Sequence, residues 1–337
     1  MNTVLVTGGA GFIGANYVEY LLDLKQGYRI LVLDKLTYAG SLKNLERVWD
    51  NPNFTFVEGD IADEDLLVTL FEKYVITDVI HFAAESHVDN SITGPEAFIQ
   101  TNIIGTFRLL EQCRASWLEN YNELKEKYKS ARFLHVSTDE VYGTLGAKGL
   151  FTEKTAYAPN SPYSASKASS DFLVRSYFHT YGLPVVTTNC SNNYGPYQHK
   201  EKLIPTIIRK ALAGESIPIY GTGKNVRDWL YVTDHCHGIY MVWKKGRLGE
   251  TYNIGGKNEK TNLEIANLIC DILDEKIPAK ESYKKQISFV EDRLGHDFRY
   301  AIDATKISEE LGWKANENFA SGIVKTVDWY LNNRDRL

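Results

Sequence analysis

The sequence predicts an α/β protein, with a doubly wound parallel sheet and a smaller α/β part interleaved with it towards the C-terminus. Three observations lead to this fold class. Strand-like runs of β-branched and aliphatic residues alternate with helical patterns through the first half of the chain. The first strand runs into a glycine-rich turn that opens a helix. The connections between successive elements are short, as expected when helices cover both faces of a sheet.

Hydrophobic periodicity predicts each element. Strands in the first half are expected over residues 3–6, 30–33, 54–57, 79–82, 133–136 and 185–189, with helices over 12–24, 64–74, 98–117 and 163–181. Beyond about residue 190 the pattern loosens into strands near 217–220 and 251–254 and helices near 204–213, 263–274 and 304–311. A last helix over 321–331 follows Asn318, an N-cap residue type. The polar run 119–130 is expected to be a solvated helical extension or a loop.

The glycine-rich turn predicts a dinucleotide-binding (Rossmann) unit. Gly8, Gly11 and Gly14 follow a strand and open a helix, so the backbone can approach a pyrophosphate at the helix N-terminus. The next strand ends at Asp34, 20 residues after Gly14. A carboxylate there accepts hydrogen bonds from ribose hydroxyls and repels a 2′-phosphate, which favours NAD over NADP. A purely structural glycine turn is the alternative, and the surrounding strand, helix and acidic residue argue against it.

Composition indicates a globular enzyme rather than a nucleic-acid or membrane binder. The 337 residues are 43% hydrophobic and 24% charged, with a net charge of −5. An anionic substrate would therefore need a local basic pocket. The four cysteines are widely spaced, so neither a zinc site nor a disulfide framework is expected, and no metal is expected elsewhere. The first strand leaves no room for a signal peptide and no apolar run reaches membrane-spanning length, so we expect a cytoplasmic protein.

Tyr163 and Lys167 form the sharpest candidate catalytic pair. Their spacing of four places both side chains on one face of a helix. A nearby ammonium stabilises phenolate, so we expect Lys167 to lower the pKa of Tyr163 towards a value useful for proton transfer. Lys167 could also hold a nicotinamide ribose. Chance matches to this spacing are common, but after a dinucleotide motif the pair predicts an oxidation site.

Thr138, Asp139 and Glu140 begin where a buried strand ends, at the edge where doubly wound sheets bind ligands. Of two adjacent carboxyls, one can keep its proton while the other is ionised, which would divide the roles of acid and base. A helix N-cap or a solvated turn remains the alternative. Ser86 and His87 follow another strand and could face a substrate, although a lone histidine is more often structural.

Two further segments could bind an anionic substrate. Asn192 and Asn193 lie in an amide-rich turn after a strand, where amides can donate to phosphate, although such turns are also common without a ligand. Arg227 and the run 292–296, with Arg293 and His296, supply local cationic groups. Each of these cations, taken alone, could be a surface ion-pair partner.

The segment TGGAGFIG, with Asp34 and the Tyr-x-x-x-Lys spacing, resembles the extended short-chain dehydrogenase/reductase family of NAD-dependent epimerases and dehydratases. Within it, STDEVYG, HFAAESHVD, SPYSASKASSD, NCSNNYGPY, RDWLYV and YNIGG are similar to the nucleotide-sugar 4,6-dehydratases, over residues 4–330. In this resemblance the Thr-Asp-Glu triplet separates the dehydratases from the sugar epimerases.

The resemblance implies dTDP-glucose as the substrate and tightly held NAD as the cofactor. Tyr163, helped by Lys167 and Thr138, would remove the proton of the 4-hydroxyl while NAD takes the hydride from C4. Glu140 would remove the C5 proton and Asp139 would protonate the departing 6-hydroxyl. Return of the hydride to C6 would give dTDP-4-keto-6-deoxy-glucose and water, for deoxysugar and above all dTDP-rhamnose biosynthesis.

The resemblance also implies binding residues. Those expected around the cofactor, with Gly8, Gly11 and Gly14, are Phe12, Ile13, Asp34, Lys35, Leu36, Thr37, Asp60, Ile61, Phe82, Ala83, Ala84, Glu85, Ser86, Thr101, Tyr163, Lys167 and Asn193. Those expected around the nucleotide sugar are Ser86, His87, Thr138, Asn192, Lys202, Leu203, Pro218, Ile219, Tyr220, Arg227, Asn262, Asp292, Arg293, Leu294, Gly295 and His296. Residues 1–190 are expected mainly to bind NAD and residues 191–337 mainly the nucleotide sugar.

The resemblance leads us to expect proline where this chain has Leu294. Proline would stiffen the turn, so the change should loosen a diphosphate-binding loop. It removes no charge, and we expect the reaction to be unaffected. The family also implies a homodimer joined by the helices around 101–117 and 163–181 in a four-helix arrangement.

Two other functions compete with this one. Another nucleotide-sugar enzyme, either a 4-epimerase or a dehydratase of a UDP- or GDP-sugar, would keep Tyr163. An epimerase has no elimination step, so Asp139 and Glu140 argue against it, but few residues reveal which nucleobase is bound. A non-catalytic NAD-binding sensor or scaffold would usually lose part of the catalytic set, which is complete here.

Overall fold

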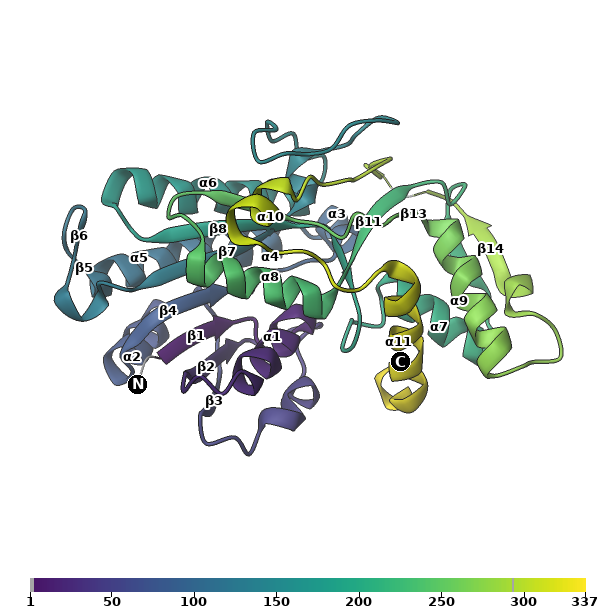
Figure 1. Cartoon of the computed structure of the whole chain (residues 1–337), viewed down its shortest axis with the longest axis horizontal. Helices are drawn as coiled ribbons and strands as arrows, with labels where there is room; N and C mark the ends of the chain where they lie inside the picture. The colour runs from purple at the N-terminus through teal and green to yellow at the C-terminus, as the bar shows by residue number, and fades with distance from the viewer. Residues whose placement is uncertain (1–2, 293) are drawn as a thin grey trace.

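The large sheet forms the body of the protein, described by a computed structural model that covers residues 3–292 and 294–337. Within those residues seven parallel strands form this sheet, in the order β12-β8-β7-β4-β1-β2-β3 (Figure 1). The strands are β1 (Thr3–Thr7), β2 (Arg29–Asp34), β3 (Phe54–Glu58), β4 (Ile76–His81), β7 (Arg132–Thr138), β8 (Val185–Cys190) and β12 (Thr251–Ile254). The predicted doubly wound parallel sheet is therefore confirmed.

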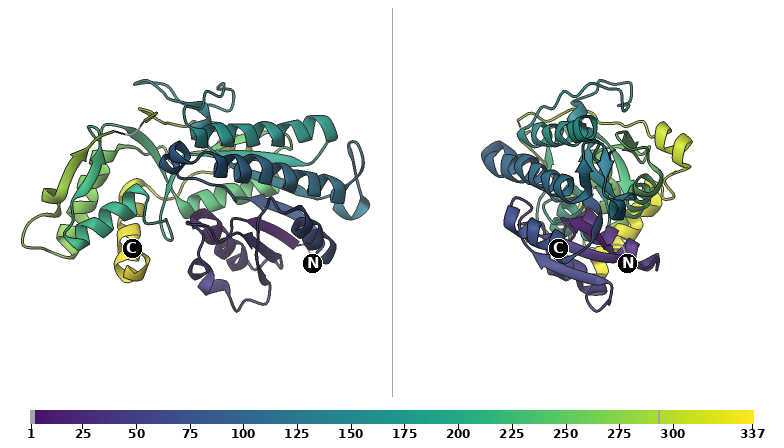
Figure 2. Two further views of the ribbon diagram at one scale, coloured as in Figure 1. Left: turned by 180° about the vertical axis from the view of Figure 1, so that it is seen from behind. Right: turned by 90° about the vertical axis from the view of Figure 1, so that its left-hand side faces the viewer.

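Helices cover both faces of this sheet because alternate strand residues are apolar on each side. On one face α1 (Phe12–Asp23) and α8 (Val232–Lys245) share a core with the strands. On the other face lie α2 (Glu64–Lys73), α5 (Thr106–Trp117) and α6 (Pro162–Tyr181). Figure 1 shows the α1 and α8 side, and the left panel of Figure 2 shows α5 and α6 from behind.

A smaller lobe lies beyond one end of the sheet (Figure 1). Its strands are β9 (Asn192–Tyr194), β10 (Ile217–Tyr220), β11 (Val226–Tyr231), β13 (Glu259–Thr261) and β14 (Ile287–Val290). They form the sheets β13-β11-β9 and β10-β14. Three helices pack on them, namely α7 (Leu203–Ala213), α9 (Asn262–Lys276) and α11 (Phe319–Asn332). Between these elements the chain returns to the large sheet to form its edge strand β12.

Shorter elements connect the main ones. They are η1 (Leu42–Val48), α3 (Val88–Thr93), α4 (Glu96–Phe98), the π-helical η2 (Ile99–Gly105), β5 (Leu118–Asn120), β6 (Glu123–Leu124), η3 (Glu126–Tyr128), η4 (Asp139–Tyr142), η5 (Tyr283–Gln286), α10 (Thr305–Leu311) and η6 (Arg334–Arg336). Within residues 3–292 and 294–337, none of the helices has the length and apolarity needed to span a bilayer.

The strands β9, β11, β13 and β14 were not predicted. Two further differences from the sequence prediction concern helices. The run 119–130 contains the hairpin β5–β6 and a short 3₁₀ turn, so the helical extension was the wrong alternative. Asn122 allows this turn because it adopts a left-handed φ of 61°, and its amide donates to the Tyr181 carbonyl. Helix α8 was not predicted. It follows β11 without a loop and contains Gly238 and β-branched Val232, which obscure a helical pattern.

The turn between β1 and α1 packs closely at the point where the strand order reverses. Gly8 has φ +70°, and a Cβ there would lie 2.6 Å from the amide nitrogen of Ala83, just after β4. A Cβ on Gly14 would overlap the carbonyl oxygen of Gly8. Glycine at both positions therefore lets α1 start directly at the carboxyl edge of the sheet.

Gly14→Ala should therefore lower the free energy of unfolding by about 1–3 kcal/mol, because the added methyl group overpacks this turn. The control is Gly146→Ala, where a Cβ would meet no atom within 4 Å. That variant should lie within about 0.5 kcal/mol of the wild type. Urea unfolding of the three proteins measures the difference, and equal stability of Gly14→Ala and wild type would contradict the close packing.

Candidate active site

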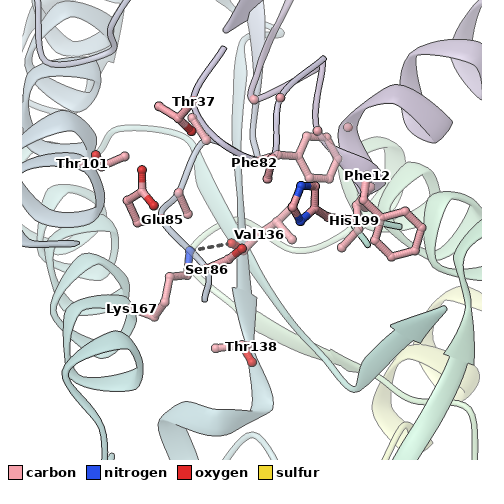
Figure 3. Close-up of a pocket in the computed structure, with 18 of the residues that line it drawn as sticks. Phe12, Thr37, Phe82, Glu85, Ser86, Thr101, Val136, Thr138, Lys167 and His199 are labelled. Atoms are coloured by element: carbon pink, nitrogen blue, oxygen red, sulfur yellow. Dashed lines mark hydrogen bonds between the residues drawn. The ribbon is translucent and has the colours of Figure 1, made fainter. Parts of the chain in front are cut away.

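A cavity of about 300 Å³ lies at the carboxyl ends of β1, β2, β4, β7 and β8. All the residues predicted to contact the cofactor line it, apart from Leu36. The five predicted catalytic residues, Thr138, Asp139, Glu140, Tyr163 and Lys167, line the same cavity. Figure 3 shows Lys167 and Thr138 in the lower part of the view, with Glu85, Thr37 and Phe82 above them. The parallel sheet thus brings together segments that are up to about 180 residues apart in the sequence.

The cofactor half of the cavity suits a dinucleotide. Among the described residues, no side chain caps the first turn of α1 behind Gly11, so its N–H groups can receive a pyrophosphate. Asp34 is buried, and its two carboxylate oxygens accept the amides of Ala10 and Leu36, each at 2.9 Å. Burial raises the pKa of Asp34, and the two amides oppose that shift. These bonds hold the carboxylate at the cavity wall, where it can receive ribose hydroxyls.

Helix α6 carries Tyr163 and Lys167 into the cavity. It begins with a capping box of Ser161 and Ser164 around Pro162, so Tyr163 lies in its first turn. Lys167 is 5% exposed, and its Nζ donates to the carbonyl of Val136 on β7 at 2.8 Å (Figure 3). The helix cap and this hydrogen bond together fix the positions of Tyr163 and Lys167 relative to the end of β7.

The predicted lowering of the tyrosine pKa is wrong. Burial raises the pKa of Tyr163 well above its ordinary value, the charge of Glu140 adds to this, and a hydrogen bond with Thr138 opposes it. The physical reason is that Lys167 directs its ammonium at the Val136 carbonyl, and its charge interacts with Asp171 on the far side. Without a cationic neighbour directed at its oxygen, a buried phenol stays protonated.

The carboxyls of Asp139 and Glu140 occupy different environments. Thr138 ends β7, and its Oγ1 accepts the Glu140 amide at 3.3 Å, which turns the chain into η4. Asp139 is 1% exposed, and its Oδ2 has no hydrogen-bond partner among the described residues. Burial raises the pKa of Asp139 well above its ordinary value, as do the charges of Glu140 and Asp228. Asp139 therefore gives up its proton less readily than an ordinary carboxyl, whereas Glu140 is half-buried at the cavity wall.

The two histidines near the end of β4 have structural contacts. His81 is buried and shares hydrogen bonds with the hydroxyls of Thr7 at 2.7 Å and Thr106 at 2.9 Å, which confirms the predicted core role. His87 is not among the residues that line the cavity. Its Nδ1 accepts the amide of Asn90 and caps α3, and its Nε2 lies 3.7 Å from the carboxylate of Glu201.

The predicted substrate residues divide into two groups. Ser86, Thr138, Asn192 and Lys202 line the cavity. Arg293 lies outside the described residues. The residues of the second group do not line the cavity; they are His87, Leu203, Pro218, Ile219, Tyr220, Arg227, Asn262, Asp292, Leu294, Gly295 and His296. Except for His87 they belong to the smaller lobe or the segment after β14.

In the smaller lobe, neighbouring residues fix the side chains of Arg227 and His296. Arg227 is 5% exposed and donates from Nη2 to the carbonyl of Asp297 at 3.0 Å, with its guanidinium 4.1 Å from the centre of the Tyr300 ring. His296 Nδ1 lies 2.6 Å from Asp292 Oδ1, and its ring contacts the edge of Tyr220. These contacts place a cationic group beside the loop that contains Leu294, which is 77% exposed.

Sequence patterns did not identify several residues of the cavity, including Gln198, His199 and Glu201. They also missed Asn102 in the π-helical η2. Its Oδ1 accepts the amide of Glu85 at 2.8 Å, and its Nδ2 donates to the Glu85 carbonyl and to Ser166 Oγ on α6. Asn102 thus fixes the wall after β4 to the helix of Tyr163. The only signal available was an amide side chain in a largely apolar helix, and Gln100 in the same segment gives the same signal.

The family follows from comparison with known proteins. Residues 5–326 match the family model described as GDP-mannose 4,6 dehydratase. A dTDP-glucose 4,6-dehydratase of Xanthomonas campestris pv. campestris (strain B100) is 57% identical over 336 residues, which is 99% of this chain and 94% of that protein. This chain belongs to the dTDP-glucose 4,6-dehydratase family.

Solved structures share the whole fold. A dTDP-glucose 4,6-dehydratase from Streptomyces venezuelae, with NAD bound, is 45% identical and superposes with a TM-score of 0.90, covering 99% of this chain and 98% of that one. A UDP-glucose 4-epimerase from Thermotoga maritima is 30% identical with a TM-score of 0.85, covering 98% and 99%. The fold is therefore common to the dehydratase family and to epimerases, so the site must distinguish the reactions.

The raised pKa of Asp139 predicts a pH-dependent gain in stability for Asp139→Asn. The folded-state pKa lies above the unfolded value of about 3.9, so the unfolded chain releases a proton that the folded protein keeps. The wild type is therefore progressively destabilised as the pH rises from about 4 towards the folded pKa. Asparagine has no such cost, and its stability advantage should grow by up to about 1.4 kcal/mol per pH unit.

Urea unfolding of both proteins at pH 5, 6 and 7 measures this difference. The exposed Asp65→Asn is the matched control for the same chemical change. An advantage of Asp139→Asn that stays constant over these pH values would mean that Asp139 is ionised in the folded protein.

Proposed function

We propose that this chain is a dTDP-glucose 4,6-dehydratase that converts dTDP-glucose to dTDP-4-keto-6-deoxy-glucose and water with bound NAD. The observation that carries the proposal is a buried Asp139, whose pKa is raised above its ordinary value, beside Glu140 in the same cavity as Tyr163. An elimination needs an acid for the leaving hydroxyl and a base for the adjacent proton. A 4-epimerase needs neither, and a scaffold has no use for either. The 57% identity to a dehydratase of that name supports the same reaction.

The oxidation step uses Tyr163, Thr138 and Lys167. When bound along Gly8, Asp34 and Lys167, NAD would supply the hydride chemistry, taking a hydride from C4 of the glucose and returning it to C6. To accept the proton of the 4-hydroxyl, Tyr163 must first be ionised, and the positive charge of bound NAD and of Lys167 would favour its phenolate form. The Thr138 hydroxyl, which is hydrogen-bonded to Tyr163, orients that side chain. When NAD is bound, the buried Lys167 ammonium, one helical turn after Tyr163, would hold the nicotinamide ribose and add positive charge on the side of the phenol.

The elimination step uses the carboxyl pair. The C4 ketone acidifies the C5 hydrogen, and Glu140 removes it as a base. Asp139 keeps its proton until O6 departs and then transfers that proton to it, so the hydroxyl leaves as water. Its uncommitted Oδ2 is available to contact O6. When C6 has been reduced, Glu140 returns its proton to C5.

Proton balance then requires a reset of the site. After each turnover Tyr163 has gained the proton of the 4-hydroxyl and Asp139 has lost one to water. Thr138 lies between them, hydrogen-bonded to Tyr163 and with Oγ1 3.5 Å from Asp139 Oδ1. Its hydroxyl, a donor and an acceptor at once, can pass a proton from the phenol to the carboxylate.

The remaining assignments are proposals about binding and assembly. Residues 1–190 bind mainly NAD, and residues 191–337 bind mainly the nucleotide sugar, with Arg227 and His296 directed to its diphosphate. The protein is a homodimer joined through α5 and α6, as the family resemblance implies; on α6 the apolar side chain of Phe172 is 57% exposed. The four buried free cysteines are compatible with a cytoplasmic location, and the product serves deoxysugar synthesis.

The direct test is incubation of the purified protein with dTDP-glucose without added NAD, followed by the alkaline absorbance of 4-keto sugars. We expect keto product from dTDP-glucose and little from UDP-glucose. Product with no added cofactor would show that NAD is retained through turnover. Absence of product even with NAD supplied would contradict the dehydratase assignment and favour an epimerase or another nucleotide sugar.

Glu140→Gln tests the base. The amide cannot accept the C5 proton, so deuterium from heavy water should not appear at C5, while NAD remains bound to the purified variant. Mass spectrometry of the recovered sugar measures the label, and the exposed Glu126→Gln is the matched control. Normal incorporation at C5 in Glu140→Gln would sink this role for Glu140.

A further inference from the structure

A second polar cluster lies behind the active site on helix α6. Asp171 is one helical turn beyond Lys167 and is 5% exposed. Among the described residues its carboxylate receives three side-chain hydrogen bonds: from His135 Nε2 at 3.0 Å, Ser137 Oγ at 2.8 Å and the Tyr157 hydroxyl at 2.8 Å. Asp171 does not line the cofactor cavity. A buried carboxylate with this many donors is held in one position.

Two of these donors flank the contact of Lys167. His135 and Ser137 stand on either side of Val136, whose carbonyl accepts the Lys167 ammonium. Side chains two apart on a strand share a face, so His135 and Ser137 both point towards α6. Asp171 therefore forms hydrogen bonds with the β7 residues immediately before and after Val136, whose carbonyl accepts the Lys167 ammonium. Helix α6 and strand β7 are joined at three successive residues.

The charges on α6 are also coupled. A buried ammonium is costly unless an opposite charge or several hydrogen bonds compensate it. Burial lowers the pKa of Lys167, and the carboxylate of Asp171 opposes this shift. Burial in turn raises the pKa of Asp171 to about 6, against the effects of Lys167 and of its donors Ser137 and Tyr157. Ionised Asp171 thus favours charged Lys167.

We propose that Asp171 is a positioning residue that acts through Lys167, holding the ammonium against the Val136 carbonyl and keeping it charged beneath Tyr163. The proposal rests on the proposed function, because it concerns the efficiency of the oxidation at C4. Asp171 touches neither substrate nor cofactor. It determines how well Lys167 can hold the nicotinamide ribose and support a phenolate on Tyr163.

A second cavity, of about 860 Å³, lies on the other side of this cluster, and both Asp171 and Tyr157 line it. Asp171 can therefore exchange its proton with solvent away from the substrate. Several titratable and charged groups surround Asp171. Those close to it are Lys167 and Arg175 on α6, His135 on β7, and Tyr142 and Tyr157 in the segment after β7. Those across the second cavity are Glu153, Lys154, Arg247, Glu250, Lys306 and Glu310. Within this set, burial raises the pKa of Asp171 to about 6, inside the pH range of the test below.

The test is steady-state kinetics of Asp171→Asn, purified with its retained NAD, between pH 5.5 and 8. Asparagine mimics protonated Asp171, so at pH 8 we expect kcat to fall on the order of tenfold with KM for dTDP-glucose within about twofold. As the pH falls through about 6 the wild type loses the same support, so the ratio of wild-type to variant kcat should shrink. Asp171→Glu, which keeps the charge, should recover part of kcat.

A ratio that stays constant across this pH range would overturn the proposal, since a purely structural defect would lower kcat equally at every pH. So would an unchanged kcat for Asp171→Asn. Absence of keto product from the wild type would instead count against the proposed function, and NAD content and thermal unfolding of each variant separate either result from misfolding.

Two milder variants keep the proposal testable if Asp171→Asn does not fold. Ser137→Ala and Tyr157→Phe each remove a donor to the ionised carboxylate, which raises the pKa of Asp171. The acid limb of the kcat profile, which is the fall of kcat at low pH, should therefore move to higher pH in both variants. Ser308→Ala on α10 is the matched control for the same change. Acid limbs that coincide with that of the wild type in both variants would overturn the role of Asp171.

Discussion

The carboxyl edge of the parallel sheet is the constraint on which the rest of the structure depends. Every buried strand of the large sheet ends at this edge, so residues that follow different strands meet there. The close contact of Gly8 with Ala83 allows α1 to begin at the edge, and the end of β7 presents Thr138 and Asp139 beside it. A nucleotide bound along the edge therefore lies directly over the catalytic groups.

Burial then determines which groups carry protons. It raises the pKa values of Asp139 and Tyr163, whereas Lys167, equally buried, is compensated by a carbonyl and by Asp171. An acid that retains its proton suits an elimination. A phenol with a raised pKa needs additional positive charge to act as a base, and a bound nicotinamide cation together with Lys167 would provide it. The ligand-binding and proton-transfer properties of the site are thus coupled.

The sequence predicted the strands of the large sheet well because they are short, buried and mostly apolar, but it did not predict β9, β11, β13 and β14 of the smaller lobe. It predicted the pairing of Tyr163 with Lys167 because helical spacing is regular. It did not predict α8, whose pattern is weakened by Gly238. The direction of the tyrosine pKa also could not be predicted, since it depends on burial and on where the ammonium points. The capping role of His87 likewise depends on the local turn rather than on residue type.

The most direct measurement is the fate of deuterium in dTDP-[4-²H]glucose. If the site oxidises C4, eliminates water and reduces C6, the product should carry the deuterium at C6 even when the medium is ordinary water. Magnetic resonance or mass spectrometry of the isolated sugar locates the label. Deuterium found at C4 of a sugar that keeps its 6-hydroxyl would contradict the account and show that the protein epimerises its substrate instead.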